Sequence, residues 1–352
     1  MKRKYLIIGA GHQGLAMSAH LALNGEDIQL WNRTPENIRK IKETKTIDCK
    51  GFINGSARLE GVSECIEEVL SDTILIATPS TAHKDIAKIL AKIMLPNTIV
   101  YLNPGRTFGA IEFYLELVKN DCVNLPCIVE TQSIIYTCRK IGESQVYIYT
   151  LKENVKMAKI GGENREIRAR LPECIRDKFT MVETVLETSL SNIGMILHCA
   201  PVLFNIGWIE SEKYEFKYYY DGISKSVANL LEELDRERVN VARKMGINVE
   251  TLVQWFSSTY GINGSGILEC IRKNECYSSI DAPMSIEHRY LDEDVPNGLV
   301  PIECLGKSLG VDVSAITLII DLACRVRGKD YRILGRQFDA ERIAKVLKLI
   351  DE

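Results

Sequence analysis

Three glycines near the N-terminus have the spacing of a dinucleotide-binding loop. Gly9, Gly11 and Gly14 follow a short apolar run, Tyr5–Ile8, and open a stretch with helical periodicity. In a strand–loop–helix unit the first glycine permits the tight turn, the second lets a pyrophosphate approach the backbone, and the third lets the helix lie close to the sheet. The N-terminus of the helix, where His12 lies, offers free N–H groups to a phosphate. The pattern predicts dinucleotide binding rather than an ordinary glycine-rich turn.

The end of the second predicted strand bears on which dinucleotide is bound. An acidic residue there would accept hydrogen bonds from the ribose of NAD and repel a 2′-phosphate. This chain has Asn32 and then Arg33. Asn32 carries no charge, and Arg33 offers a planar fork of donors. NADP(H) is therefore favoured, with NAD(H) as the other cofactor to consider. The alternative is that Arg33 is a solvated surface charge and that both forms are accepted.

Polar loops follow the later strands of the predicted sheet. Thr78 and Pro79 end the strand Asp72–Thr78, and the loops Asn103–Thr107 and Glu130–Ser133 follow two further strands. Ligands of parallel sheets lie beyond the carboxyl ends of the strands. These loops are therefore candidates for cofactor or substrate walls, and each is equally well explained as a turn.

A second group of chemistry-bearing residues lies in the C-terminal half. Ser191, His198 and Asn205 are seven residues apart, so they would share one face of an otherwise apolar helix. A core histidine bonded to a backbone carbonyl would explain His198 by itself. However, the polar stretch His288–Pro296 supplies a guanidinium that could hold a carboxylate and several carboxylates that could orient an imidazole.

The elements that carry these residues alternate between strands and helices over the first half of the chain. This order predicts an α/β Rossmann-type doubly wound sheet over residues 1–186, completed by strand-like sequence at 144–182. From Ser191 onward the periodicity is helical, which predicts an all-α substrate domain over 187–352, with a boundary near Glu183–Leu190. Pro201 should kink the apolar helix at Leu190–Ile209.

The composition excludes several classes of protein. The chain has 352 residues, which suits two domains, and its 44 basic and 47 acidic residues nearly cancel. We therefore expect no nucleic-acid or membrane partner. Eleven cysteines without a C-x-x-C pair predict a reducing, cytoplasmic location and no structural metal site. The polar residues within 190–209 favour a buried helix over a membrane span.

Four stretches of the chain resemble the opine dehydrogenases, the octopine and nopaline dehydrogenase family. The resemblance covers nearly the whole chain, and the N-terminal glycine loop fits it. The stretches are ETQSIIYTCR, SNIGMILHCAPVLFN, YYYDGISKSVANLLEELDRERV and HRYLDEDVPNGLVPIECLG.

The resemblance implies roles for particular residues. His198 matches the family's catalytic acid/base, Asp294 the carboxylate paired with it, and Arg289 the arginine of the substrate site. Asn205 and Tyr220, which lie in the matching stretches, are the remaining candidates for substrate contact. Cys199 departs from the family pattern, in which a proline commonly follows the histidine.

These observations predict an NAD(P)H-dependent opine dehydrogenase. Such an enzyme condenses the amino group of an amino acid with a 2-oxo acid such as pyruvate and reduces the imine. One alternative is a 2-hydroxy acid dehydrogenase of the ketopantoate or glycerol-phosphate reductase kind, which a lysine base would favour. Another is a catalytically silent NADP-binding regulator, but His198 and Arg289 are both present. A homodimer is compatible with the sequence.

Overall fold

The chain falls into two compact units. The computed structural model describes residues 3–161 and 167–351. The first unit comprises Met1–Gly105 and Gly109–Val185, and the second comprises Leu186–Glu352 together with the three residues Arg106–Phe108. Arg106–Phe108 thus belongs with the second unit, although the sequence on either side of it belongs with the first.

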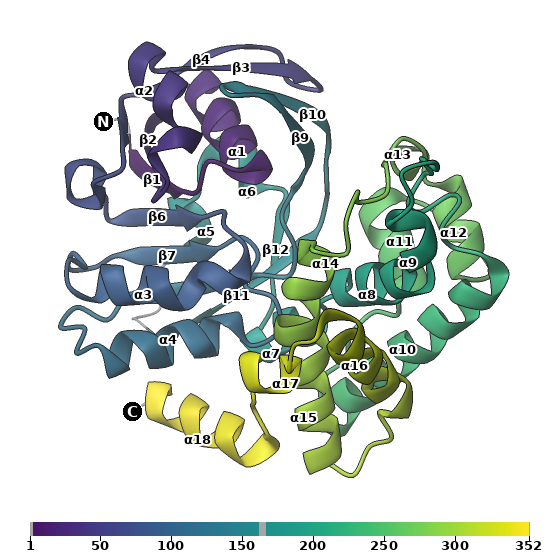
Figure 1. Ribbon diagram of the computed structural model, residues 1–352. Coiled ribbons are helices and arrows are strands. Elements are labelled where there is room, and N and C mark those ends of the chain that lie inside the picture. Colours follow the sequence, from purple (N-terminus) through teal and green to yellow (C-terminus); the bar gives the residue numbers. More distant parts are fainter. Residues whose placement is uncertain (1–2, 162–166, 352) are drawn as a thin grey trace. The chain divides into compact units, whose positions relative to one another are not determined.

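An eight-stranded sheet forms the centre of the first unit (Figure 1). Its strands pair in parallel, except that β11 runs antiparallel to β8. The order reverses at β1, which lies between β2 and β6, as in a doubly wound fold, and the predicted Rossmann-type class is confirmed. In spatial order the strands are β12 (Phe179–Met181), β11 (Val155–Ile160), β8 (Cys127–Thr131), β7 (Ile99–Leu102), β6 (Thr73–Ile76), β1 (Lys4–Ile8), β2 (Asp27–Trp31) and β5 (Gly61–Ser63).

A second, four-stranded sheet packs over the helix that follows the glycine loop (Figure 1). Its order is β4 (Gly55–Arg58), β3 (Thr46–Gly51), β10 (Gln145–Leu151) and β9 (Tyr136–Gly142). The helix, α1 (His12–Leu23), is therefore covered on one side by the large sheet and on the other by the small one. The remaining helices of this unit are α2 (Arg39–Thr44), α3 (His83–Ala91), α4 (Gly109–Lys119), α5 (Ile167–Arg170) and α6 (Glu173–Arg176).

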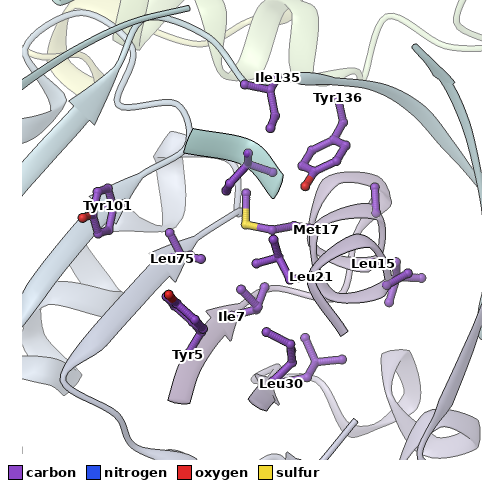
Figure 2. Close-up of a cluster of buried hydrophobic side chains, with 14 of the residues drawn as sticks. Tyr5, Ile7, Leu15, Met17, Leu21, Leu30, Leu75, Tyr101, Ile135 and Tyr136 are labelled. Atoms are coloured by element: carbon purple, nitrogen blue, oxygen red, sulfur yellow. The ribbon is translucent and has the colours of Figure 1, made fainter. Parts of the chain in front are cut away.

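Burial on both sides explains why α1 is apolar almost all the way round. Leu15, Met17 and Leu21 are all fully buried. Figure 2 shows Met17 and Leu21 between strand residues such as Ile7 and Leu30 and the side chain of Tyr136 from β9, with Leu15 on another side of the helix. A helix enclosed by two sheets needs small and apolar residues on both faces. This packing fixes the position of the loop from which α1 starts.

The second unit is built from helices, as the sequence predicts (Figure 1). Its longest helix, α10 (Lys225–Lys244), begins at Ser224, whose side chain accepts a hydrogen bond from the N–H of Val227. Helix α8 (Gly194–Phe204) packs against α10, α14 (Arg289–Asp292) and α16 (Ser314–Arg327). The other helices are α7 (Val185–Leu190), α9 (Ile206–Ile209), α11 (Leu252–Tyr260), α12 (Ile267–Lys273), α13 (Glu275–Ser278), α15 (Val300–Ser308), α17 (Tyr331–Leu334) and α18 (Ala340–Asp351).

The apolar stretch at Leu190–Ile209 differs from the single kinked helix predicted for it. Helix α8 continues through Pro201 and ends at Asn205, whose backbone (φ −118°, ψ 19°) separates it from α9. Ser191 lies before α8 begins. Ser191, His198 and Asn205 therefore do not share one helical face. Within residues 3–161 and 167–351, no helix combines the length and the hydropathy needed to cross a membrane.

Candidate active site and dinucleotide loop

The three glycines between β1 and α1 meet three different steric demands. Gly9 has φ +113°, and a Cβ there would lie 3.0 Å from the carbonyl oxygen of Ala77. A Cβ on Gly14 would lie 1.8 Å from the carbonyl oxygen of Gly9, so only glycine lets α1 start this close to the turn. Beyond Gly11 itself and its two neighbours in the chain, no described atom lies within 4 Å of a Cβ built on Gly11. The loop is thus open at the position where a pyrophosphate would approach, and its geometry fits a dinucleotide.

The side chain of Asn32 holds the glycine loop in place. Its Oδ1 accepts a hydrogen bond from the N–H of Ala10 (3.0 Å), and its Nδ2 donates to the carbonyl of Thr34 (2.9 Å). The neighbouring Arg33 has a side chain that is 66% exposed and lies 3.4 Å from the carboxylate of Asp85. Its guanidinium is therefore accessible to a 2′-phosphate, but it also takes part in a surface ion pair.

Strand β9 lies against the start of α1. The Nδ1 atom of His12 accepts a hydrogen bond from the N–H of Lys140 (2.7 Å), and the Nζ of Lys140 lies 3.5 Å from the carbonyl oxygen of Ala10. Partial burial lowers the pKa of Lys140, against the opposing charge of Glu143. His12 is therefore tied to β9 by its ring, and Lys140 places a cation beside the glycine loop.

Thr78 and Pro79 follow β6 on the other side of Gly9. The Cγ2 of Thr78 would lie 2.9 Å from a Cβ on Gly9, which places Thr78 directly against the turn. Pro79 precedes a short 3-10 turn at Ser80–Ala82. Thr78 therefore borders the loop, and Pro79 follows it in the chain.

In the second unit, the structure brings His198 and Asp294 together. His198 lies in the middle of α8, and its Nδ1 is 2.7 Å from Oδ2 of Asp294. Asp294 is fully buried and lies at the turn between α14 and α15, where the backbone forms one π-helical turn at Val295–Leu299. A carboxylate only accepts hydrogen bonds, so Nδ1 carries the proton and Nε2 keeps its lone pair. The pair has the geometry of a base and the group that orients it.

A buried arginine lies on the other side of Asp294. Nη1 of Arg106 is 3.3 Å from Oδ1 of Asp294, and Nε of Arg106 is 3.3 Å from Oε1 of Glu293. Glu293 is also buried. Burial opposes the charge of Arg106, but Asp294 and Glu293 outweigh that cost and raise its pKa. The cation is therefore permanent and balances two adjacent carboxylates.

Tyr290 stacks on the imidazole of His198. The ring centroids are 4.0 Å apart and the ring planes are inclined by 16°. The adjacent Cys199 continues α8 without a break, and its thiol donates to the carbonyl of Tyr290 (3.3 Å). Cys199, which departs from the family pattern, is thus accommodated in a regular helix and joins α8 to α14.

The surroundings of His198 keep its imidazole neutral. Burial lowers the pKa of His198, because desolvation disfavours the cation, and the positive charges of Arg289 and Arg106 lower it further. The charge and hydrogen bond of Asp294 oppose this effect without reversing it. At neutral pH the imidazole is therefore able to accept a proton.

The remaining predicted residues lie in different surroundings. The side chain of Arg289 is 50% exposed, 3.9 Å from Glu293, and lies over the ring of Tyr290. Asn205 instead donates to the carbonyls of Pro201 and Gly222, both at 2.8 Å. The hydroxyl of Tyr220 donates to the carbonyl of Arg272 (2.7 Å). The guanidinium of Arg289 is thus accessible to solvent, whereas Asn205 and Tyr220 fasten backbone segments to one another.

Three residues of the site region did not emerge as site residues from the sequence. Arg106 lies in the loop Asn103–Thr107, which was predicted only as a wall, and a basic residue directly after a Pro-Gly turn was the available signal. Tyr290 lies next to Arg289 in the polar stretch, and Lys140 directly follows the quoted stretch ETQSIIYTCR. None of the three has a spacing that indicates its contacts.

Two family models match the chain. Residues 181–327 match the model described as the α-helical domain of NAD/NADP octopine/nopaline dehydrogenase. Residues 4–120 match the model of the N-terminal part of NAD-dependent glycerol-3-phosphate dehydrogenase. The first match contains the whole of the His198–Asp294 pair, and the second contains the glycine loop.

Known proteins match the chain over nearly its full length. An opine dehydrogenase of Arthrobacter sp. (strain 1C) is 32% identical over 345 residues, which are 96% of this chain and 94% of that relative. Octopine dehydrogenase solved with NADH and L-arginine has a TM-score of 0.76 at 16% identity, covering 93% of this chain and 90% of that one. Yersinopine dehydrogenase with bound NADP+ also has a TM-score of 0.76, at 14% identity, covering 99% and 98%.

The two kinds of match have different weight. The structural matches, at 14–16% sequence identity, show a shared fold. The 32% sequence identity to the Arthrobacter enzyme, which extends over nearly the full length of both chains, identifies the family. The match includes both the dinucleotide loop and the helical domain that holds His198 and Asp294. The chain therefore belongs to the opine dehydrogenase family, a group of NAD(P)-dependent oxidoreductases that act on CH–NH bonds.

Proposed function

We propose that this enzyme joins an amino acid to a 2-oxo acid of the pyruvate type by reductive condensation, with His198 as the acid/base. The observation that carries the proposal is the 2.7 Å contact between Nδ1 of His198 and the buried carboxylate of Asp294. That contact leaves Nε2 as the nitrogen that exchanges protons with the substrate. Octopine dehydrogenase, which shares the fold, has been solved with L-arginine and separately with pyruvate.

The chemistry needs a base at its first step. An amino acid is mostly an ammonium ion at neutral pH, and only the free amine attacks a carbonyl carbon. Nε2 of His198 accepts the ammonium proton, the amine adds to the 2-oxo acid, and water leaves to give an imine. The nicotinamide, when bound, supplies the hydride that reduces the C=N bond. The product is a secondary amine with two carboxylates, and one proton is consumed in the reduction.

Arg289 is our candidate for binding a substrate carboxylate. Its guanidinium is half exposed, it interacts electrostatically with His198, and its contact with Glu293 is long at 3.9 Å. A planar fork of donors suits a carboxylate. Asn205 and Tyr220 are not retained in this role, because their donors already bind backbone carbonyls.

We further propose that NADP(H) is preferred and that the enzyme is cytoplasmic. The first proposal is supported by the uncharged Asn32 and the accessible Arg33 at the end of β2. Yersinopine dehydrogenase has been solved with NADP+ and octopine dehydrogenase with NADH, so the shared fold accommodates both forms. The proposed location is supported by the eleven cysteines, all within the described residues and none of them in a disulfide. A homodimer stays a prediction.

The test follows NADPH oxidation by purified protein with amino acids and 2-oxo acids, alone and in pairs. We expect negligible oxidation with either substrate alone and a clear rate with a matching pair. If a 2-oxo acid alone consumes NADPH at the full rate and yields its hydroxy acid, the reductive condensation is refuted, and the enzyme is a hydroxy-acid dehydrogenase.

A further inference from the structure

Arg106 is a buried cation to which the proposed reaction assigns no role. Its side chain is 9% exposed, and it contacts Asp294 and Glu293 through different nitrogens. The structure also keeps space for it. A Cβ on Gly194, the first residue of α8, would lie 2.6 Å from Nη1 of Arg106. The helix that carries His198 therefore begins with the residue that allows Arg106 to reach Asp294.

The two oxygens of Asp294 have separate partners. Oδ2 accepts from His198 at 2.7 Å, and Oδ1 lies 3.3 Å from Arg106. Asp294 and Glu293 are neighbours in sequence, and both are almost fully buried. Two buried carboxylates side by side favour uptake of a proton unless a cation balances them. A protonated Asp294 could donate to Nδ1 of His198, which would move the imidazole proton to the other nitrogen.

We propose that Arg106 is a positioning residue that keeps Asp294 a hydrogen-bond acceptor for His198 and so reserves Nε2 for the substrate proton. This inference rests on the proposed role of His198 as the acid/base. Arg106 acts through Asp294 and is not assigned a contact with the substrate. It would be a specific requirement of the reaction, beyond its part in holding the fold.

Several groups face the pair from the neighbouring elements. The charged ones are Arg106, Glu293 and Arg289. His288, at the start of α14, is uncharged at neutral pH, because burial and then Arg289 lower its pKa to about 4. Burial raises the pKa values of Cys199, Tyr218 and Tyr290, so these groups also stay neutral. From α10, the Asp235–Arg238 ion pair reaches the carbonyl of Leu190, just before α8.

The test measures the titration of the His198 imidazole by NMR in protein with labelled histidine, without cofactor or substrate. The chain has five histidines, and His198→Ala assigns the signal. In the double variant Arg106→Gln/Glu293→Gln, one positive and one negative charge are removed together. Loss of the nearby cation makes proton uptake by the pair easier, so the titration should move upward by about one pH unit or more.

Two further variants keep the test decisive. Glu293→Gln leaves the charge of Arg106 uncompensated, so the imidazole should titrate at lower pH than in the wild type. Arg238→Gln removes another fully buried arginine from its ion pair with Asp235 and should leave the titration of His198 unchanged. Should the double variant fail to fold, Glu293→Gln still provides the measurement.

The outcomes separate this inference from the proposed function. An unchanged His198 titration in folded Arg106→Gln/Glu293→Gln, or in Glu293→Gln when the double variant does not fold, would overturn the positioning role. An equal shift in Arg238→Gln would also overturn it, because the effect would then be a general response to lost stability. If the shifts occur as expected while wild-type protein shows no two-substrate reaction, Arg106 orients the pair and the proposed reaction is the part that fails.

Discussion

The Nδ1 atom of His198 is occupied by its hydrogen bond to Asp294, which leaves Nε2 to exchange protons with the substrate. Nδ1 donates to a carboxylate that is fully buried, so water cannot take its place. The ring of Tyr290 lies flat against the imidazole and restricts its rotation. The same burial lowers the pKa of the imidazole, which keeps it a proton acceptor at neutral pH.

His198 and Asp294 should act as a unit in turnover. We expect His198→Ala to lower kcat about a hundredfold or more, as for a lost general acid/base. Asp294→Asn should cause a large part of the same loss, since an amide can donate to Nδ1 as well as accept from it and so no longer fixes the imidazole proton there. The double variant should be little worse than His198→Ala. Steady-state kinetics with both organic substrates measures this, and losses that multiply would assign Asp294 a separate task.

The cofactor preference depends on the end of β2. We expect wild-type enzyme to have a higher kcat/KM with NADPH than with NADH. Asn32→Asp keeps the acceptor for the N–H of Ala10 but adds a charge that repels a 2′-phosphate, so the preference should shrink or reverse. Arg33→Gln should lower kcat/KM with NADPH and leave kcat/KM with NADH unchanged. A wild-type preference for NADH of about tenfold would refute the assignment to Arg33.

The proposed role of Arg289 in carboxylate binding can be tested with a substitution that keeps the positive charge but removes the planar guanidinium. In Arg289→Lys the planar fork is lost, so the KM of at least one organic substrate should rise strongly. NADPH binding, measured by fluorescence, should hold. Arg327 pairs with Glu287 and Asp292, which lie close to Arg289 in the sequence. Arg327→Lys therefore serves as the control and should leave both KM values unchanged. Unchanged KM values for both organic substrates would leave Arg289 with only its contacts to Glu293 and Tyr290.

The sequence predicted the members of this site unevenly. His198 and Asp294 are 96 residues apart, and their pairing came from the family resemblance, since no periodicity links α8 to the turn after α14. Arg106 is farther away still, in a loop whose flanking sequence belongs to the other unit. A long-range ion pair leaves no local pattern, so residue chemistry could nominate His198 and Asp294 without joining them and could not single out Arg106 from its loop.

At the scale of elements, the alternation of strands and helices was predictable because each follows from local patterns of apolar residues. The positions at which helices break could not be predicted from such patterns. A proline in the first turn after Thr34 predicts one short helix over 35–43, but the chain divides at Ile38 (φ −121°, ψ 0°) into a short 3-10 turn and α2. Helix α8 passes through Pro201 and stops at Asn205, whose amide reaches back to the carbonyl of Pro201. Such endings depend on side-chain contacts that propensities do not contain.

Two glycines at the start of α1 allow the effect of a substitution on stability to be separated from its effect on dinucleotide binding. Gly14→Ala places a methyl group on the backbone of Gly9, with no flexible side chain to give way. We expect it to destabilise the protein by about 1–3 kcal/mol or more in chemical unfolding. Gly11→Ala meets no described atom within 4 Å and should fold as the wild type does. It should nevertheless lose dinucleotide affinity, because the methyl fills the space a pyrophosphate needs. Wild-type affinity in folded Gly11→Ala would place the pyrophosphate elsewhere.

At the scale of the whole molecule, the two requirements of the reaction lie in separate units. The glycine loop and the end of β2 belong to the first unit, while His198, Asp294 and Arg106 belong to the second. Each unit has its own buried core. A substitution in the glycine loop should therefore affect dinucleotide binding, and one at His198 should affect proton transfer. Only the complete reaction needs both processes.

The reverse reaction brings both units into one measurement. A secondary amine with two carboxylates, whose mass is the sum of the two substrates less water plus two hydrogens, should reduce NADP+ and release the amino acid and the 2-oxo acid. His198→Ala should bind NADP+ normally in fluorescence titration yet release both products about a hundredfold more slowly than the wild type, because the amine proton has lost its acceptor. Gly11→Ala should show the opposite defect, with weakened binding and restored release at high NADP+ concentration. If His198→Ala cleaves the secondary amine at the wild-type rate, the acid/base of this enzyme is another residue.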